Sequence, residues 1–152
     1  MLSFLIYITL FIYLLYILWI AEPLFLKRRI SAKKDNPNIS VIISARNESD
    51  NVNSLIKSLK KQTYPNNKFE VIIANDRSTD DTLNKLKELK QDFKNLKIIN
   101  IEETTINWSP KKWALNQCIE KSKGEIILQT DADCIHNESW IESMAQPFED
   151  KN

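Results

Sequence analysis

The chain has 152 residues, enough for one domain, and its 21 basic and 20 acidic side chains give a formal net charge of +1. This near balance gives no electrostatic reason to expect a nucleic-acid partner. The single glycine, Gly124, excludes a G-x-G-x-x-G dinucleotide fingerprint and a P-loop, because each motif needs more than one glycine.

Residues 2–21 contain no charged side chain, and about 20 apolar residues in a helix are enough to cross a bilayer core. A basic leader and a small-residue cleavage site are both missing, so residues 1–22 are predicted to be an uncleaved transmembrane anchor rather than a signal peptide.

A basic juxtamembrane linker is predicted over residues 23–37. No Lys or Arg precedes the apolar stretch, whereas several follow it: Lys27, Arg28, Arg29, Lys33 and Lys34. The positive-inside bias therefore predicts a single-pass protein of the cell inner membrane, with the N-terminus outside and the following domain in the cytoplasm.

From residue 38 onward, apolar runs of strand length alternate with segments of helical periodicity. Strands are predicted over the ranges 39–45, 69–74, 96–101 and 125–130. Helices are predicted to follow them, over 52–59, from 78 to 93, from 110 to Gly124 and over 137–148. This alternation predicts an α/β fold with a mainly parallel sheet flanked by helices on both faces.

Local signals place two helix starts and one helix end. Ser78-Thr79-Asp80-Asp81 has the S-x-x-D pattern of a helix N-terminus. Ser109 is an N-cap candidate, with Pro110 at the first helical position. Gly124 is expected to end that helix.

Asp131-Ala132-Asp133 follows the fourth predicted strand. Two carboxylates at the end of a buried strand are costly unless a cation lies between them, and residues two apart on extended backbone project to the same side. Oxygen ligands of this kind suit Mg²⁺ or Mn²⁺, which also accepts phosphate oxygens from a substrate. The competing interpretation is a solvated acidic turn in which Asp133 caps the next helix.

Two other strand ends carry polar clusters, Arg46-Asn47-Glu48 and Asn75-Asp76. In open parallel sheets, ligands bind beyond the carboxyl ends of the strands, so these clusters predict a binding site shared with the acidic pair. A further metal ligand from His136, the only histidine, is an alternative that its expected solvent-facing position disfavours.

Three segments resemble, in order and spacing, the nucleotide-sugar half of family 2 glycosyltransferases. They are S-V-I-I-S-A-R-N-E (40–48), V-I-I-A-N-D-R-S-T-D-D-T (71–82) and K-K-W-A-L-N-Q-C-I-E-K-S-K-G-E-I-I-L-Q-T-D-A-D-C (111–134). The resemblance implies a GT-A-like, Rossmann-like domain over residues 38–152, in which the D-x-D motif holds a metal and a sugar diphosphate.

Residue by residue, the resemblance implies a donor site. The segment 45–48 would wrap the base and ribose, Asp76 would accept a hydrogen bond from the base, usually uracil, and the lysine pair would lie near the diphosphate. The implied nucleotide-sugar-binding residues are Ala45, Arg46, Asn47, Glu48, Asp76, Lys111, Lys112 and Asp131. The implied metal ligands are Asp131 and Asp133.

The chain departs from the family pattern in three places. Ser44 replaces a common proline, Arg77 stands where glycine is common, and Pro110 also replaces a common glycine. Nothing after Asp133 matches the family's acceptor half, which carries the general base of inverting transfer. The chain is therefore expected to be truncated and to carry only the donor and metal half.

The expected function is a membrane-anchored, metal-dependent and inverting glycosyltransferase. It would move a sugar from a UDP-sugar to the hydroxyl of a lipid-linked or polysaccharide acceptor. The alternative is a catalytically inactive membrane-anchored fragment that binds a nucleotide sugar. A receiver-like phosphoacceptor domain fits less well, because it needs an acidic pair where this chain has Arg46-Asn47-Glu48.

Overall fold

The computed structural model describes residues 2–25, 36–103 and 105–148. The chain divides into two compact units, Met1–Ser31 and Ala32–Asn152. The basic cluster predicted for the juxtamembrane linker lies outside the described residues.

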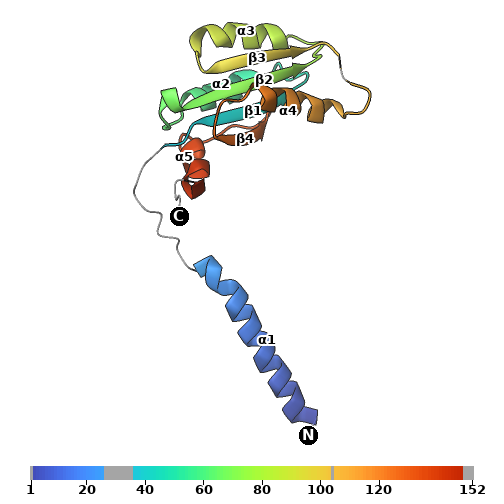
Figure 1. The fold of residues 1–152 in the computed structure, drawn as a ribbon, viewed down its shortest axis with the longest axis vertical. Coiled ribbons are helices and arrows are strands. Elements are labelled where there is room, and N and C mark those ends of the chain that lie inside the picture. Colours follow the sequence, from blue (N-terminus) through green and yellow to red (C-terminus); the bar gives the residue numbers. More distant parts are fainter. Residues whose placement is uncertain (1, 26–35, 104, 149–152) are drawn as a thin grey trace. The chain divides into compact units, whose positions relative to one another are not determined.

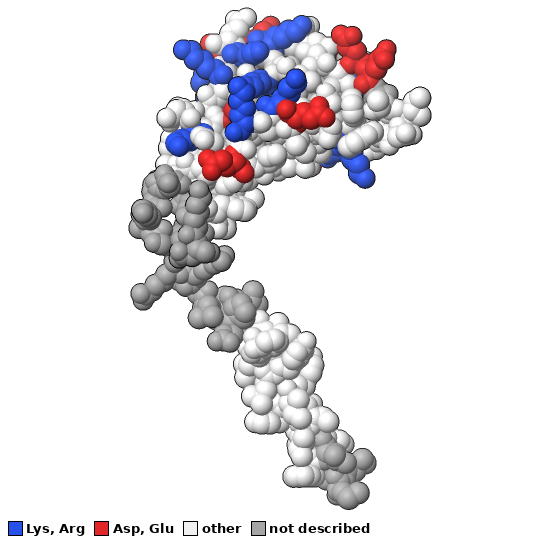
Figure 2. All heavy atoms as spheres, viewed as in Figure 1, with Lys and Arg blue, Asp and Glu red and all other residues white. Residues whose placement is uncertain are grey.

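The first unit contains one helix, α1 (Leu2–Phe25). Its large apolar side chains are exposed, Tyr7 and Trp19 among them, and its described side chains include no charged one (Figure 2). Within the part of the chain that the structure describes, no helix has the length and apolarity needed to cross a membrane. The transmembrane anchor predicted over residues 1–22 is thus not supported, and membrane attachment stays a prediction.

The second unit is built on one parallel sheet, as predicted. Its strands are β1 (Ile39–Ala45), β2 (Phe69–Asp76), β3 (Leu96–Ile101) and β4 (Ile126–Asp131), in the order β3-β2-β1-β4. β1 is almost entirely buried, since it has a neighbouring strand on each side and helices over both faces. Its run of Ile and Val residues suits a strand of this kind.

Helices cover both faces of the sheet (Figure 1). The helices are α2 (Val52–Lys60), α3 (Thr82–Asp92), α4 (Pro110–Lys121) and α5 (Trp140–Ala145), with short 3-10 turns at Asn66–Lys68 and Gln146–Phe148. Val41 and Ile43 face a core with α2 and α3, whereas Ile42 packs with Ala114 and Cys118 of α4 on the opposite face. This alternation along β1 reflects the two-residue period of a strand.

The order of the strands creates a topological switch point. From β1 the chain moves to β2 and then β3, and α4 returns it across the sheet to β4 on the other side of β1. The loops that leave β1 and β4 therefore diverge, and a crevice forms where open α/β sheets bind ligands.

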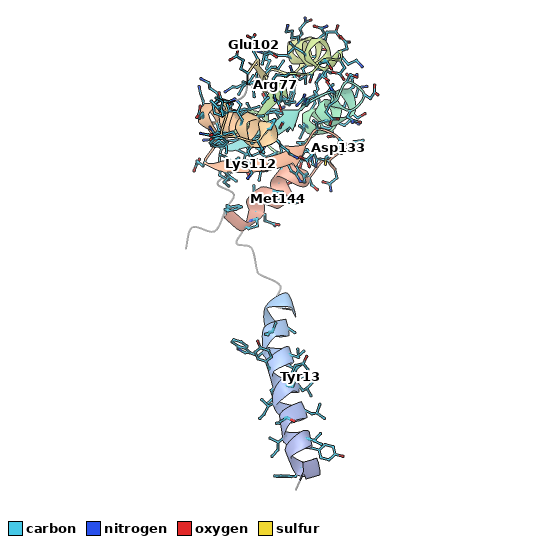
Figure 3. All side chains as sticks on the ribbon, turned by 90° about the vertical axis from the view of Figure 1, so that its right-hand side faces the viewer. Tyr13, Arg77, Glu102, Lys112, Asp133 and Met144 are labelled. Atoms are coloured by element: carbon cyan, nitrogen blue, oxygen red, sulfur yellow. The ribbon has the colours of Figure 1, made fainter. Side chains whose placement is uncertain are left out.

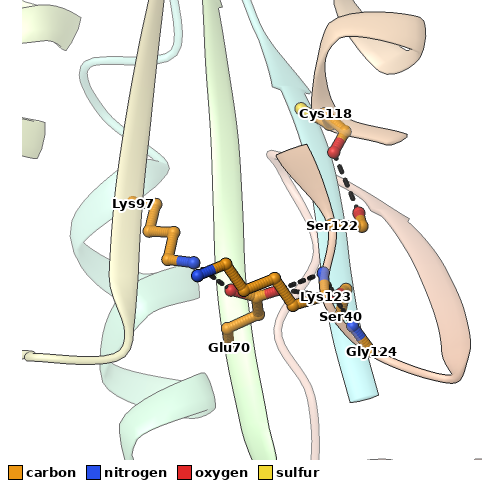
Figure 4. A network of polar contacts seen from close by, with 7 residues as sticks. All are labelled: Ser40, Glu70, Lys97, Cys118, Ser122, Lys123 and Gly124. Carbon is orange, nitrogen blue, oxygen red and sulfur yellow. Dashed lines mark hydrogen bonds and ion pairs between the residues drawn. The ribbon is translucent and has the colours of Figure 1, made fainter. Parts of the chain in front are cut away.

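A polar network ties together the amino-terminal part of the sheet (Figure 4). Ser40 Oγ and the Lys123 N–H each donate to Glu70 Oε1 at 2.7 Å, and Lys97 Nζ pairs with Glu70 Oε2. Burial would raise the pKa of Glu70, but these hydrogen bonds outweigh it and hold the pKa below its ordinary value. The network thus stabilises the fold above the ordinary pKa, and this stabilisation is lost as pH falls through the lowered value.

Gly124 does not end α4, which was the prediction; the helix ends at Lys121. The Gly124 N–H donates to Ser40 Oγ at 2.8 Å, and a Cβ at residue 124 would lie only 2.4 Å from Ser40 N and 2.6 Å from the Ile39 carbonyl carbon. The glycine is therefore required by the close approach of two backbones.

The start of α3 also differs from the prediction. The helix begins at Thr82, and Ser78 does not cap it. The Ser78 hydroxyl instead accepts a hydrogen bond from the Asn47 N–H across the loops, at 3.0 Å. The predicted start of α4 is confirmed, because Ser109 is the N-cap residue and Pro110 is the first residue of the helix.

The substitution Gly124→Ala should destabilise the domain by about 1–3 kcal/mol, because the new methyl group must displace backbone atoms of β1. Thermal unfolding followed by circular dichroism should show a melting temperature several degrees lower. Lys121→Ala, at the exposed end of α4, is the matched control and should change stability by no more than about 0.5 kcal/mol. An unchanged melting temperature for Gly124→Ala would contradict the close-approach explanation.

Candidate functional site

A cavity of about 320 Å³ opens at the carboxyl ends of the strands, beside the switch point between β1 and β4. Figure 3 faces this end of the sheet and labels Arg77, Lys112 and Asp133. The lining residues come from three strand ends and the start of α4: Ser44, Arg46, Glu48, Asp76, Pro110, Lys111, Asp131, Ala132 and Asp133.

Asp131 and Asp133 converge on this cavity, as the D-x-D spacing predicted. Parallel pairing places Asp131 beside Ser44 of β1. Ala132 is 3% exposed and packs into the core, while the aspartates on either side of it are exposed. β4 ends at Asp131, and a turn over Ala132 and Asp133 follows, so this turn with Ala132 packed inward leaves both carboxylates on the lining of the cavity.

Lys111 lies against this acidic pair. Its Nζ is 2.7 Å from Asp131 Oδ1, and both side chains are more than half exposed. The hydrogen bond to Asp131 and the charges of Asp131 and Asp133 raise the pKa of Lys111. Exposed ion pairs stabilise a fold by about 0–1 kcal/mol, so a divalent cation or a phosphate can displace this contact at little cost.

Asp76 reaches the same cavity from β2. Its side chain is almost completely buried, and Oδ1 accepts a hydrogen bond from Arg77 Nε at 2.8 Å. Asp76 and the aspartate pair line the same cavity, so the structure brings the Asp76 carboxylate to a pair that lies more than 50 residues further along the chain. The three polar strand ends thus meet at one cavity through Arg46, Glu48, Asp76 and the aspartate pair, and ligand binding there stays a prediction.

The loop after β1 is bound to the loop after β2. Asn47 adopts a left-handed conformation (φ 56°), and its Oδ1 accepts a hydrogen bond from the Thr79 N–H at 2.8 Å. The Glu48 N–H donates to Thr82 Oγ1 at 2.8 Å. These contacts hold Arg46 and Glu48 at the rim of the cavity, because the backbone between them cannot move independently.

Asp80 strengthens the same connection. Its carboxylate accepts hydrogen bonds from the Thr82 hydroxyl and from the N–H groups of Thr82 and Ser49. These bonds, with the Thr82 hydroxyl foremost, lower the pKa of Asp80 to about 2. The carboxylate is therefore ionised at neutral pH, and it joins the two loops as a charged acceptor.

Three of the predicted binding residues do not line the cavity. Ala45 is fully buried in the core, and the side chain of Asn47 accepts a hydrogen bond from Thr79. Lys112 is exposed to solvent and does not line the cavity. Their predicted contacts with a nucleotide stay predictions. Conversely, sequence reasoning did not assign Ser44 to the site, although its neighbour across the sheet is Asp131.

The described residues contain no group of three His, Cys, Asp or Glu side chains placed to bind a metal. Mg²⁺ commonly takes only one or two protein carboxylates and completes its shell with water and substrate phosphates. Two exposed carboxylates on one cavity, here Asp131 and Asp133, fit that arrangement. They would bind a cation most strongly when a diphosphate supplies further oxygens.

His136 does not join this site. Its Nε2 lies 2.9 Å from Thr130 Oγ1, and its ring stacks on Trp140 with centroids 3.9 Å apart. Burial lowers the pKa of His136. The ring is half-buried rather than solvent-facing, and the alternative of His136 as a metal ligand finds no support.

Comparison with protein families gives an independent result. The family model described as "Glycosyl transferase family 2" matches residues 40–152. Among curated proteins, "Glycosyltransferase AglE" of Haloferax volcanii is 32% identical over 106 residues, which are 70% of this chain and 34% of that protein.

Two solved structures share the fold. TarS of S. aureus, residues 1–349 in complex with UDP, has a TM-score of 0.63 and 30% identity, covering 71% of this chain and 31% of that one. The mannosyltransferase PcManGT of Pyrobaculum calidifontis, in complex with GDP-Man and Mn²⁺, has a TM-score of 0.67 and 25% identity, covering 89% and 39%. This chain thus spans about a third of the length of these relatives.

The contacts of Asn47 predict a difference between two substitutions at this position. Asn47→Ala loses the hydrogen bond from Thr79 and places alanine in a left-handed conformation, which should destabilise the domain by about 1–2 kcal/mol. Asn47→Gly loses the same hydrogen bond but suits the backbone. Urea denaturation should therefore show Asn47→Ala as the less stable variant, and equal or reversed stabilities would contradict this account of the loop.

Proposed function

The chain belongs to glycosyl transferase family 2, and from this membership we propose that it forms the donor-binding half of a metal-dependent glycosyltransferase. The whole protein would transfer a sugar from a nucleoside diphosphate sugar to an acceptor hydroxyl. One observation carries the proposal: Asp76, Lys111, Asp131 and Asp133 line a single cavity at the switch point of the sheet.

The positions of the lining side chains support one orientation of the nucleotide sugar in the cavity. Lys111 and the aspartate pair lie at the β4 side of the cavity, where a diphosphate would meet both a cationic side chain and the start of α4. Helix N-termini favour anions. Asp76 and the β1 loop would then receive the nucleoside. The complexes of TarS with UDP and of PcManGT with GDP-Man and Mn²⁺ support a ligand of this class.

Asp131 and Asp133 are the residues proposed to hold Mg²⁺ or Mn²⁺. When bound, such an ion would neutralise negative charge on the departing diphosphate. Lys111 can contribute to the same stabilisation, because its ammonium group is already within 2.7 Å of Asp131 and can turn toward a phosphate oxygen.

Membrane attachment through residues 2–21 is part of the proposal, with the N-terminus outside and the family 2 domain in the cytoplasm. The supporting observations are the absence of charge in this stretch and the exposed apolar side chains of α1. An apolar helix surface of this kind is costly in water, and a lipid environment removes that cost.

The proposed donor site predicts metal-dependent nucleotide binding. In isothermal titration calorimetry of the full chain in detergent, UDP should bind with Mn²⁺ and bind at least about tenfold more weakly when EDTA replaces the metal. Asp133→Asn should remove most of this metal-dependent gain. Asp92→Asn, at the end of α3, is the matched control and should behave as the wild type.

Two results would contradict this proposal. One is an absence of binding to every nucleoside diphosphate tested with Mn²⁺. The other is binding that neither EDTA nor Asp133→Asn affects, since a diphosphate bound without the aspartate pair would not use the cavity as proposed.

Membrane attachment has a separate test. The expressed full chain should sediment with membranes and resist extraction by alkaline carbonate, while a variant lacking residues 1–22 should be released. Recovery of the full chain in the soluble fraction would contradict attachment, and would leave the donor site unaffected.

A further inference from the structure

Lys111 occupies an unfavourable position in α4. It is the second residue of the helix, and the first turn contains no acidic side chain. A positive charge in the first turn of a helix opposes the helix dipole. Within the described part of the chain, the one ion pair of Lys111 is with Asp131, at 2.7 Å. The aspartate, and not the helix, therefore stabilises the ammonium group where it lies.

This ion pair involves one of the two carboxylates proposed to hold the metal. Asp131 and Asp133 bring two negative charges to the lining of the cavity, and the ammonium group of Lys111 neutralises one of them. A divalent cation at the same carboxylate would be repelled by the ammonium group beside it. Lys111 and a divalent cation therefore compete for Asp131.

Of the two partners in this ion pair, Lys111 is the one that can move. Asp131 is the last residue of β4, and parallel pairing holds its backbone beside Ser44. The ammonium group of Lys111 lies at the end of a flexible four-carbon stem, and its side chain is 60% exposed. Lys111 also lines the cavity, so a diphosphate bound there would offer it a second partner of opposite charge.

We propose that Lys111 makes metal binding depend on the nucleotide: it holds Asp131 when no nucleotide is bound, and it exchanges this contact for a phosphate oxygen when a nucleoside diphosphate binds. A cation that arrives alone must displace the ammonium group, whereas a cation that arrives with the nucleotide need not. Lys111 acts on the metal through Asp131 and is in this respect a positioning residue. The inference rests on the proposed function, because it assumes that the cavity binds both ligands.

The exchange gives Lys111 opposite effects on metal affinity in the two states of the site. Without a nucleotide, loss of the ammonium group removes a competitor, so the metal should bind more tightly. With a nucleotide bound, the same loss removes a contact to the diphosphate, so this advantage should shrink or reverse. By linkage, the factor by which UDP tightens metal binding equals the factor by which the metal tightens UDP binding.

The test measures Mn²⁺ binding to the full chain in detergent, with and without saturating UDP, from the electron paramagnetic resonance signal of free Mn²⁺. Without UDP, Lys111→Gln should bind Mn²⁺ at least about threefold more tightly than the wild type, and the gain from UDP should fall at least about threefold. Lys111→Arg retains the positive charge and should restore most of the competition. Lys121→Gln, in the last turn of α4, is the matched control. Asp133→Asn identifies the binding that belongs to the aspartate pair.

A lysine that only orders Asp131 would give the opposite sign, because its loss would weaken Mn²⁺ binding without UDP. That result, or an unchanged affinity, would overturn the inference, and the proposed function would stand if UDP still binds with Mn²⁺. Exposed ion pairs contribute little to stability, so Lys111→Gln should melt within a few degrees of the wild type. A large loss of stability would assign Lys111 to the fold and overturn the inference as well. A wild type that binds neither Mn²⁺ nor UDP would overturn the proposed function and this inference with it.

Discussion

Parallel pairing of β1 with a strand on each side is the constraint on which the site depends. Ser44 is paired with Ala74 of β2 and with Asp131 of β4, so residues from distant parts of the chain end at one edge of the sheet. At the opposite end, Gly124 and the hydrogen bonds of Ser40 set how closely β4 begins beside β1. A shift of either strand would move the acidic pair away from Asp76.

The carboxylates of Asp76 and Asp131, both at this edge of the sheet, form ion pairs of different kinds. Asp76 is buried, and its bond to Arg77 is part of the fold. Asp131 is exposed, and its contact with Lys111 is weak enough to be exchanged for a ligand. The buried pair therefore suits recognition of a fixed shape, such as a base edge, whereas the exposed pair suits a mobile cation and a diphosphate whose charge changes during reaction.

The strands could be predicted from the sequence, since runs such as Ile39–Ala45 and Leu96–Ile101 are short, β-branched and bounded by polar residues. Asp131 and Asp133 both line the cavity, but the predicted reason was wrong, because β4 ends at Asp131 and a turn over Ala132 and Asp133 follows in place of extended backbone. Ser78 and Gly124 were misread as helix signals, because their partners, Asn47 and Ser40, are distant in sequence. For Arg77 the sequence showed only that it stands where family members often have glycine.

The central claim is that the carboxyl ends of the strands, and not another surface, hold the metal and the nucleotide. Paramagnetic broadening of amide signals by Mn²⁺ in an NMR spectrum locates the ion directly. With UDP present, the account predicts the strongest broadening at Ser44 and Asp131 to Asp133, and markedly weaker broadening at Ser40 and Gly124 at the other end of the sheet. Broadening centred on the amino-terminal end, or none at the aspartate pair, would contradict the account.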